Sequence, residues 1–428
     1  MLSKEENILV TRTGPGTILG QVMRRYWVPV ALAHELPEPD CPPIQLKVLG
    51  ESLVAFRDTE GRIGLVQEFC PHRRASLFLG RNEENGLRCV YHGWKYDVTG
   101  QCVDMPTEPP ESTFKQRIRL TSYPTLELGD VIWAYMGPPD KRPPEPKFLW
   151  TQIPASHRHI TRTRQECNWL QALEGGIDSI HASIMHRVLT PNTPKAGTRG
   201  FIIEALPTRE DVYLTDYGLC YGSVRPLPGD QYYVRIYHYV MPFHTFFPFQ
   251  IRGGNVPMAH GHMFVPMDDE HCMVFNLIGR YGADPLTAAE RERMEWERGR
   301  GPGEITADFR KVRRPENHWL VDRQAQKTET FTGIEGINNQ DHAIQESMGP
   351  IVDRTQEHLG STDKAIIAAR RLLLEAIKTV EAGGHPRGLD TSYYRALATE
   401  HLLPNGADWW ETLQREIYPA EVAAIAAR

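Results

Sequence analysis

The sequence predicts an α+β protein in which a small all-β domain precedes a larger domain of antiparallel sheet and packed helices. Two observations lead to this prediction. Short β-favouring runs alternate with Gly and Asp/Asn turns over residues 46–136, whereas strand-like and helix-like runs are mixed after a proline-rich break. The chain has 428 residues, enough for about two or three domains with buried cores and no disulfide scaffold.

The composition excludes several classes of protein. Hydrophobic residues make up 40% of the chain and charged residues 24%, which is typical of a folded enzyme and not of a disordered chain. A net charge of −6 offers no cationic field to nucleic acid. The first residues contain no cationic stretch followed by an apolar core, and the longest apolar runs are strand-sized. We therefore expect no signal peptide, no membrane span and a cytoplasmic location with reduced cysteines.

Proline and glycine residues interrupt the helix and strand patterns and divide the chain into four segments. Residues 1–45 form an amino-terminal segment with a helix expected over 17–26, and residues 46–136 form the all-β domain. Residues 137–146 contain five prolines and form a linker, because such a stretch continues neither helix nor sheet. Residues 147–428 form the second domain.

Within the second domain, helical and strand signals alternate in blocks. Residues 165–187 favour helix, strands dominate up to about residue 280, and residues 286–300 favour helix again. The clearest helix runs from Lys364 to Glu381, with apolar residues on one side and Gly383 after its end.

Four residues of the first domain have the composition of a metal site. Cys70 and His72 form one pair, and after sixteen intervening residues Cys89 and His92 form a second pair. Two interpretations compete: a closed structural zinc site, and a [2Fe–2S] cluster in which two histidines replace two cysteines on one iron. Zinc motifs of this composition usually pair like with like, whereas here each arm carries one cysteine and one histidine.

The motif Cys-x-His, sixteen residues, Cys-x-x-His-Gly-Trp resembles the Rieske signature of the aromatic-ring-hydroxylating oxygenases. The resemblance implies a Rieske [2Fe–2S] cluster held by Cys70, His72, Cys89 and His92. Neutral imidazole ligands raise the reduction potential of such a cluster to ~ −150 to +300 mV. A centre in this range accepts electrons from a flavin and iron–sulfur reductase or from a ferredoxin.

A second constellation lies past the linker. Asp178, His181 and His186 fit the mononuclear iron segment of the same family, in which two histidines and one carboxylate bind Fe(II). Positions five apart are rotated by about 140° on a straight helix, so the helix must end, bend or bulge for both histidines to reach one ion. In the family, the aspartate matching Asp178 bridges to the Rieske histidine of a neighbouring subunit, here His92. That route implies a homotrimer or a stacked hexamer.

The third iron ligand must be a distant carboxylate. Residues 335–350 resemble an acidic segment of the family in which an aspartate lies five residues before a glutamate, matching Asp341 and Glu346. We assign Asp341 as the ligand on this pattern; the competing carboxylates are Glu346, Asp353 and Asp363. Residues 351–363 resemble the phthalate-dioxygenase branch, and the resemblance implies a helix-grip-like catalytic domain.

These resemblances imply an oxygenase that uses O2 and electrons from NAD(P)H, through a reductase, to hydroxylate a small aromatic compound. An aromatic carboxylate of the phthalate or benzoate type is the favoured substrate, and N- or O-demethylation of a substituted arene is the alternative. Two other classes stay open: a non-catalytic Rieske electron carrier and a zinc-stabilised ligand-binding protein.

Substrate-binding residues are the least defined part of the sequence. The aromatic run Tyr237–Gln250 is typical either of an apolar ring-binding site or of ordinary sheet core. A carboxylate substrate needs a buried cation, and three arginines are candidates: Arg225, Arg235 and Arg252. Basic residues near the cluster ligands either attract an acidic reductase or are simply solvated: Arg73, Arg74, Arg81, Arg88 and Lys95.

Overall fold

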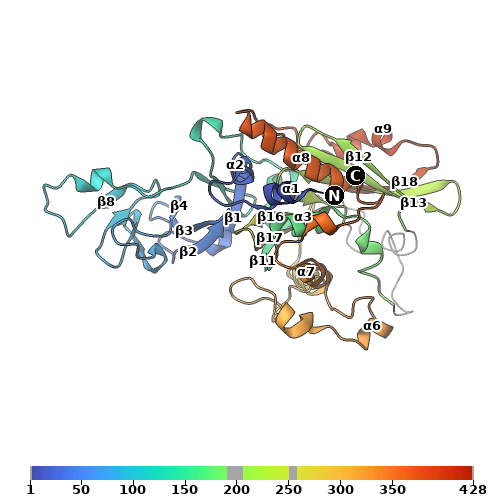
Figure 1. Ribbon diagram of the computed structural model, residues 1–428, viewed down its shortest axis with the longest axis horizontal. Coiled ribbons are helices and arrows are strands. Elements are labelled where there is room, and N and C mark those ends of the chain that lie inside the picture. Colours follow the sequence, from blue (N-terminus) through green and yellow to red (C-terminus); the bar gives the residue numbers. More distant parts are fainter. Residues whose placement is uncertain (1, 190–205, 250–257, 427–428) are drawn as a thin grey trace. The chain divides into compact units, whose positions relative to one another are not determined.

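The computed structural model describes residues 2–189, 206–249 and 258–426 (Figure 1). The chain forms two compact units. The smaller unit comprises Thr13–Glu145 and Val265–Asp268, and the larger unit comprises Met1–Arg12, Pro146–Phe264 and Asp269–Arg428. Residues 13–45 and 46–136, which the sequence analysis treats separately, thus share one unit. Within the described ranges, no helix is long and apolar enough to cross a membrane.

The smaller unit is built from three small antiparallel sheets and confirms the predicted all-β domain. Their strand orders are β1–β10–β9, β2–β3–β4 and β5–β6–β7–β8. The strands are β1 (Trp27–Leu32), β2 (Ile44–Val48), β3 (Glu51–Arg57), β4 (Ile63–Gln67), β5 (Arg81–Glu83), β6 (Gly86–Arg88), β7 (Lys95–Tyr96), β8 (Cys102–Asp104), β9 (Thr125–Leu128) and β10 (Val131–Tyr135). The helix expected near Thr17 is the short α2 (Ile18–Met23), which Thr17 caps.

Apolar side chains of β3, β4 and the following loops form a core of the smaller unit. This core includes Val54, Phe56 and Val66 and extends to Cys70 and Cys89. Burial of both cysteines places the sulfur-bearing ends of two loops against one apolar cluster. Neither cysteine forms a disulfide, so both sulfurs are available as metal ligands.

The larger unit contains one extensive antiparallel sheet, as predicted. Its order is β11–β17–β16–β15–β14–β13–β12, and β18 pairs with β14 beyond the end of β15. The strands are β11 (Arg158–Gln165), β12 (Arg209–Leu214), β13 (Gly218–Leu227), β14 (Gln231–Val240), β15 (His244–Phe246), β16 (Met258–Pro266), β17 (Cys272–Arg280) and β18 (Thr399–Pro404). Strands β14, β16 and β17 are buried almost throughout, which explains their continuous apolar and aromatic sequences.

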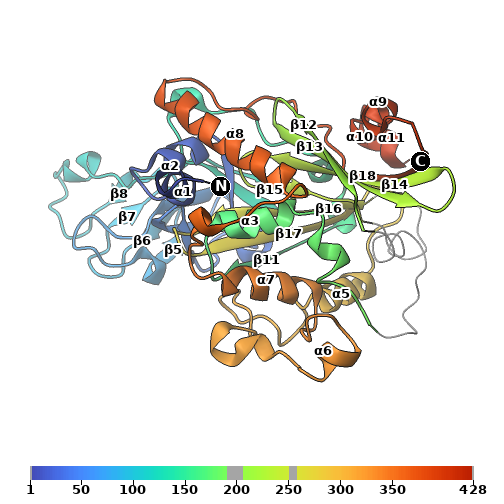
Figure 2. The same cartoon turned by 45° about the vertical axis from the view of Figure 1, so that its right-hand side comes forward.

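The helices described in the larger unit are α1 (Lys4–Thr11), α3 (Trp169–Ile177), α5 (Ala288–Glu297), α6 (Ala325–Thr328), α7 (Ile337–Ser347), α8 (Lys364–Glu381), α9 (Trp409–Thr412), α10 (Gln414–Ile417) and α11 (Val422–Ala426). Helix α3 contacts β15 and β17 of the sheet, and α8 contacts β12 and β13. Helix α8 has the bounds that the sequence predicts. Figure 2 shows α3 between α8 and α7, and α3 contacts both helices.

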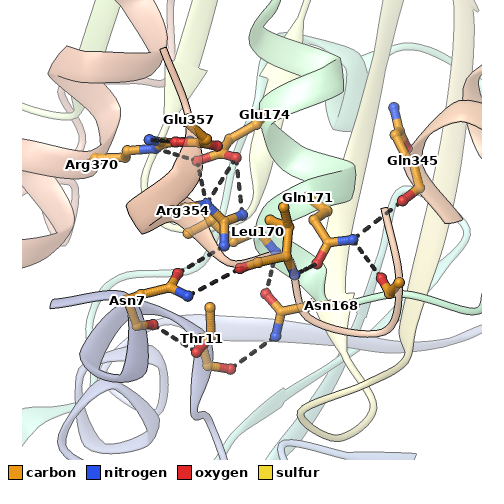
Figure 3. Close-up of polar contacts among 12 residues, drawn as sticks. Asn7, Thr11, Asn168, Leu170, Gln171, Glu174, Gln345, Arg354, Glu357 and Arg370 are labelled. Carbon is orange, nitrogen blue, oxygen red and sulfur yellow. Dashed lines mark hydrogen bonds and ion pairs between the residues drawn. The ribbon is translucent and has the colours of Figure 1, made fainter. Parts of the chain in front are cut away.

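A buried ionic network fixes α3 at the centre of this arrangement (Figure 3). Both oxygens of Glu174 accept hydrogen bonds from Arg354, the closest at 2.9 Å, and one also accepts from Arg370 at 2.6 Å. Arg370 forms two further bonds with Glu357, at 2.6 and 2.9 Å. Asn7 of α1 accepts from Arg354 at 3.1 Å. Because Glu174 lies one turn before the end of α3, this network holds the segment that follows the helix.

Neutral side chains add a second set of ties to α3. Asn168 caps the helix through Leu170 N–H, and its amide donates to the Thr11 carbonyl at 2.9 Å. Gln171 donates to the main-chain carbonyls of Gln345 and Gly349 (Figure 3). Residues far apart in sequence thereby hold α1, α3 and the end of α7 together.

Candidate metal centres

The four Cys/His residues lie in two loops of the smaller unit, and the two loops have the same pattern of backbone hydrogen bonds at their cysteines. In each loop the cysteine N–H donates to the carbonyl five residues on, at 2.9 Å for Cys70 and 2.8 Å for Cys89. Each cysteine carbonyl accepts from the N–H four residues on, at 2.9 Å in both loops. That fourth residue is left-handed in both cases, with φ 63° at Arg74 and 77° at Gly93. The loops present their cysteines in equivalent positions, whereas the histidine follows two residues after Cys70 in one loop and three residues after Cys89 in the other.

The two histidines lie close together, and so do the two cysteines. The rings of His72 and His92 lie with their centroids 4.4 Å apart, and both cysteines are buried. Burial raises the pKa of Cys89, and the adjacent Cys70 contributes to that rise. The buried Nδ1 of His92 has no hydrogen-bond partner among the described residues. Two neighbouring sulfurs, a nearby pair of imidazoles and an unsatisfied ring nitrogen fit a cluster with mixed sulfur and nitrogen ligands.

Aromatic residues pack against these cysteine and histidine side chains. The Tyr96 hydroxyl lies 3.2 Å from the Cys70 sulfur, and Trp94 stacks on His72 at a centroid distance of 4.4 Å and an interplanar angle of 8°. Phe114 meets the Trp94 ring edge-on. These rings exclude water from one side of the cysteine and histidine ligands, and a phenol O–H donates to a thiolate if Cys70 is ionised.

A second convergence lies in the larger unit. His181 Nε2 and His186 Nε2 lie 3.4 and 3.2 Å from the same oxygen of Asp341. One ligand atom from each of these side chains lies within 4.8 Å of those of the other two. Asp341 is on α7 and the two histidines follow α3, so the sheet and helix packing joins parts of the chain that are 155 residues apart. Two imidazoles and one carboxylate are the donor set of a non-haem iron site.

The local backbone explains how two histidines five residues apart face one point. Helix α3 ends at Ile177, and Asp178 is its carboxyl-terminal cap. One oxygen of Asp178 accepts from Ile180 N–H at 2.7 Å, and His181 then begins a single 3-10 turn. The helix thus ends before both histidines, so the rotation of a straight helix does not apply to them. The other Asp178 oxygen lies 3.5 Å from His181 Nδ1.

The electrostatics of this site favour a cation. Burial alone lowers the pKa of His181, but the hydrogen bonds to Asp178 and Asp341 outweigh it and raise that pKa to about 10. Burial raises the pKa of Asp341, but the two imidazoles outweigh it and hold that pKa well below 3.8. Negative charge from Asp178 and Asp341 thus lies on the two nitrogen sides of the His181 ring, which favours positive charge at this site.

The other carboxylates considered for this site lie elsewhere. Glu346 accepts from Trp319 Nε1 at 2.9 Å and from Glu166 N–H at 3.2 Å, so both of its oxygens are engaged away from the histidines. Asp353 caps the turn at Thr355, and Asp363 accepts from Gly360 N–H ahead of α8.

Several basic residues near the cluster loops are already paired. Arg88 contacts carboxylates of Glu83 and Asp104, and Lys95 contacts Glu84. Arg81 also contacts Glu83. The guanidinium groups of the other two lie over aromatic rings, Arg73 over Tyr91 and Arg74 over Phe69. Most of this set therefore forms local ion pairs.

Two of the three candidate arginines lie on the sheet, Arg225 on β13 and Arg235 on β14. Of residues 237–250, all but Gln250 fall in the described ranges; Gln250 and Arg252 lie outside them. Tyr237 stacks on Tyr221, whose hydroxyl donates to the carbonyl of Ile177 at the end of α3. Arg225 and Arg235 are both buried.

Two residues near these centres were not identified from the sequence. Gln340 lies 2.7 Å from His186 Nδ1, and Tyr96 contacts Cys70. Each adjoins a recognised motif, Gln340 directly before Asp341 and Tyr96 two residues after Trp94. Proximity to the motif was the available signal, but sequence distance alone does not indicate which neighbour faces a ligand.

Comparison with known proteins agrees with both centres. The Rieske [2Fe-2S] domain family matches residues 26–124, and the family described as LigXa C-terminal domain like matches residues 134–426. The chain belongs to the Rieske oxygenases. As a Rieske oxygenase it contains a Rieske [2Fe–2S] cluster and a mononuclear non-haem iron, and the predicted enzyme class is confirmed.

Individual relatives place this Rieske oxygenase in the phthalate-dioxygenase-like branch. The phthalate 4,5-dioxygenase oxygenase subunit of Pseudomonas putida is 37% identical, over 100% of this chain and 98% of the relative. The 3-chlorobenzoate-3,4-dioxygenase oxygenase subunit of Comamonas testosteroni is also 37% identical, over 97% and 98%. The 5,5'-dehydrodivanillate O-demethylase oxygenase subunit of a Sphingobium species is 31% identical, over 91% and 84%.

Solved structures share the fold of this Rieske oxygenase at low sequence identity. Dicamba monooxygenase bound to dicamba aligns with a TM-score of 0.57 and 17% identity, over 84% of this chain and 99% of that chain. NdmA of Pseudomonas putida CBB5 aligns with a TM-score of 0.58 and 19% identity, over 91% and 100%.

Proposed function

We propose that this Rieske oxygenase hydroxylates an aromatic carboxylate, using O2 and electrons from NAD(P)H. The electrons reach it through a flavin and iron–sulfur reductase or a ferredoxin. The observation that carries the choice of substrate is a buried arginine, Arg225, beside the turn that bears His181. Two relatives at 37% identity are named for phthalate and 3-chlorobenzoate, which are both aromatic carboxylates.

We assign the ligands as the side-chain geometry favours. Cys70, His72, Cys89 and His92 hold the Rieske cluster, and the mononuclear iron is held by His181, His186 and Asp341. When bound, the cluster supplies single electrons and the iron supplies the open coordination positions at which O2 is activated. Asp178 orients His181 through its Nδ1 side and adds negative charge beside the iron ligands.

Arg225 lacks a carboxylate partner within hydrogen-bonding distance among the described residues, although it is 0% exposed. Its one short bond, 2.9 Å, goes to the Ser223 hydroxyl. Its longer contacts go to the main-chain carbonyl of Ser223 at 3.4 Å, the Ser179 carbonyl at 3.5 Å and the Ser183 hydroxyl at 3.4 Å. Its Nε atom has no hydrogen-bond partner among the described residues. Ser179 and Ser183 lie on either side of His181.

Burial of a cation whose hydrogen bonds are long and made to neutral groups raises the free energy of the folded protein. An anion that binds to the cation lowers that free energy again. Burial lowers the pKa of Arg225, and the neighbouring Arg235 lowers it further. A substrate carboxylate bound to Arg225 neutralises this charge and brings the attached ring to the turn that carries His181. Hydrogen bonds to charged groups contribute about 1.5–3 kcal/mol, or about 10- to 150-fold in affinity.

O-demethylation is the second candidate reaction, since one relative at 31% identity is named as an O-demethylase. The same arginine serves a methoxylated aromatic acid equally well. The products differ: demethylation releases formaldehyde from the methoxy group, whereas ring dioxygenation retains every substrate carbon. Product analysis therefore distinguishes the two reactions.

The test is an oxygen-uptake screen with a suitable reductase and NADH, comparing benzoates and phthalates with their methyl esters. We expect the acids to be turned over and the esters to be poor substrates. Arg225→Met should raise KM for the acid by about 10-fold or more. Arg209→Met is the matched control, because Arg209 lies on the neighbouring strand β12 and is 53% exposed. Esters that outperform acids, or equal KM values for Arg225→Met and Arg209→Met, would contradict the proposal.

We also propose a homotrimer or stacked hexamer in which Asp178 meets His92 of the partner subunit, and a cytoplasmic location where NAD(P)H is supplied. A ring allows each cluster to serve a neighbouring iron site. Sedimentation analysis tests the assembly, and full turnover by a monomer would contradict it. Cell fractionation tests the location.

A further inference from the structure

Gln340 contacts His186 from the side opposite Asp341. Its Oε1 atom lies 2.7 Å from His186 Nδ1, and Asp341 Oδ1 lies 3.2 Å from His186 Nε2. Gln340 is buried on α7, with 6% of its surface exposed, and directly precedes Asp341. One turn of α7 therefore supplies contacts to both nitrogens of a single imidazole.

The hydrogen bonds of Gln340 determine which way its amide faces. Its Nε2 donates to the main-chain carbonyl of Ile334 at 2.8 Å. A carbonyl only accepts, so the NH2 end of the amide must face Ile334 and the oxygen must face His186. An amide oxygen in turn requires a proton on His186 Nδ1. The lone pair of the neutral ring is then on Nε2, facing Asp341.

We propose that Gln340 is a positioning residue that fixes His186 in the tautomer able to bind the mononuclear iron through Nε2. This inference rests on the ligand assignment made above. Ligand histidines generally donate their second ring N–H to an outer partner, and loss of that partner weakens metal binding by about 10- to 100-fold. His181 has Asp178 as its outer partner, at 3.5 Å, so the two histidines are held by groups of different charge.

The difference in charge gives a reason for an amide at this position. Asp178 and Asp341 together bring two negative charges, which balance the charge of Fe(II). A carboxylate at position 340 adds a third negative charge and favours Fe(III) over Fe(II). Gln340 supplies the acceptor that His186 needs and leaves the charge balance unchanged.

The experiment measures the Fe(II) dissociation constant of the full chain by anaerobic competition with a chelator. Gln340→Leu removes the acceptor at similar volume and should weaken Fe(II) binding by about 10- to 100-fold. Gln345→Leu is the matched control, because Gln345 is also buried on α7 and bonds to Gln165 at 2.5 Å. We expect the control to change the constant by less than about threefold, and the visible absorption of the Rieske cluster to be the same in both variants.

Gln340→Glu separates hydrogen bonding from general packing. It keeps the acceptor for His186 but loses the donor to the Ile334 carbonyl, so it should bind Fe(II) more tightly than Gln340→Leu while lowering the Fe(III)/Fe(II) potential of the mononuclear site. Equal weakening by Gln340→Leu and Gln345→Leu, or a Gln340→Glu variant as weak as Gln340→Leu, would overturn the proposal. If Gln340→Leu does not fold, Gln340→Asn replaces it, since the shorter arm cannot span Ile334 and His186 together.

His186→Ala keeps this test distinct from the ligand assignment. If His186→Ala loses the mononuclear iron while Gln340→Leu binds it normally, the ligand assignment stands and the role of Gln340 is refuted. If His186→Ala keeps the iron, the ligand assignment itself is refuted, and the inference about Gln340 is refuted with it.

Discussion

The sharpest stability prediction concerns Glu174, the acid between two buried arginines (Figure 3). The Arg354 side chain is 0% exposed, and Glu174 is the acid that pairs with it, at 2.9 Å. Glu174→Gln keeps the shape of the side chain and one acceptor oxygen but removes the negative charge, so the acceptors that face Arg354, this amide oxygen and Asn7, are then neutral. Arg370 keeps its two bonds to Glu357. The substitution therefore strands one cation, not two.

Removal of one partner from a buried ion pair costs about 3–5 kcal/mol, because the remaining charge is left without compensation. Arg354→Met should cost less, since Glu174 still pairs with Arg370 at 2.6 Å. In the double variant the stranded charge is absent, so we expect it to be more stable than Glu174→Gln alone. A double-mutant cycle isolates this coupling free energy, which should exceed about 1 kcal/mol.

The assay is urea unfolding followed by far-UV circular dichroism, with the cluster absorption as a separate report on the smaller unit. Burial raises the pKa of Glu174, but the charges of Arg354 and Arg370 outweigh it and hold that pKa below its ordinary 4.5. The contribution of Glu174 is thus complete above about pH 4.5 and is lost as the pH falls through the lower folded pKa. The difference between parent and Glu174→Gln should shrink on acidification. A loss below about 1 kcal/mol at pH 7, or a difference that grows towards low pH, would refute the account.

Three further predictions address the metal centres and the substrate. His181→Ala should lose the mononuclear iron and all turnover but keep the visible spectrum of the cluster; iron retention at the parent level would contradict this. Tyr96→Phe removes an O–H donor to Cys70 and should lower the cluster potential by about 20–60 mV, measured by redox titration, because one hydrogen bond contributes about 0.5–1.5 kcal/mol. An unchanged potential would exclude that bond. Arg225→Met should raise KM for a carboxylate substrate and leave kcat for a neutral arene unchanged; a fall in both kcat values would indicate a structural role.

Much of the fold was predictable because its signals are local. The helix Lys364–Glu381 carries an apolar face and a glycine stop, and the short strands of the smaller unit are bounded by turn residues. The two Cys/His pairs were also predictable, because the cysteine and histidine of each pair lie within four residues of each other in the sequence. The association of residues 1–12 with the larger unit was not predictable, because it depends on long-range contacts such as those of Asn7 with Val352 and Arg354.

The mononuclear iron site could be predicted only in part, because it also depends on contacts between residues far apart in the sequence. His181 and His186 stand in one motif, but the carboxylate that lies with them is 155 residues beyond His186, and three other candidate acids, Glu346, Asp353 and Asp363, follow it within 22 residues. On a straight helix, His181 and His186 would point in different directions. Because α3 ends at Ile177, before both histidines, this constraint does not apply to them. Gln340 has no motif of its own, since its role depends on which neighbour its amide reaches.

As a Rieske oxygenase, this polypeptide holds two different iron centres. The most direct measurement is the iron and acid-labile sulfide content of the purified parent chain beside that of His186→Ala, with low-temperature electron paramagnetic resonance of the reduced proteins. We expect about three irons and two sulfides in the parent, about two of each in the variant, and the same Rieske resonance in both. A parent chain with no more iron than sulfide, or a variant that loses the Rieske resonance together with its iron, would contradict the account.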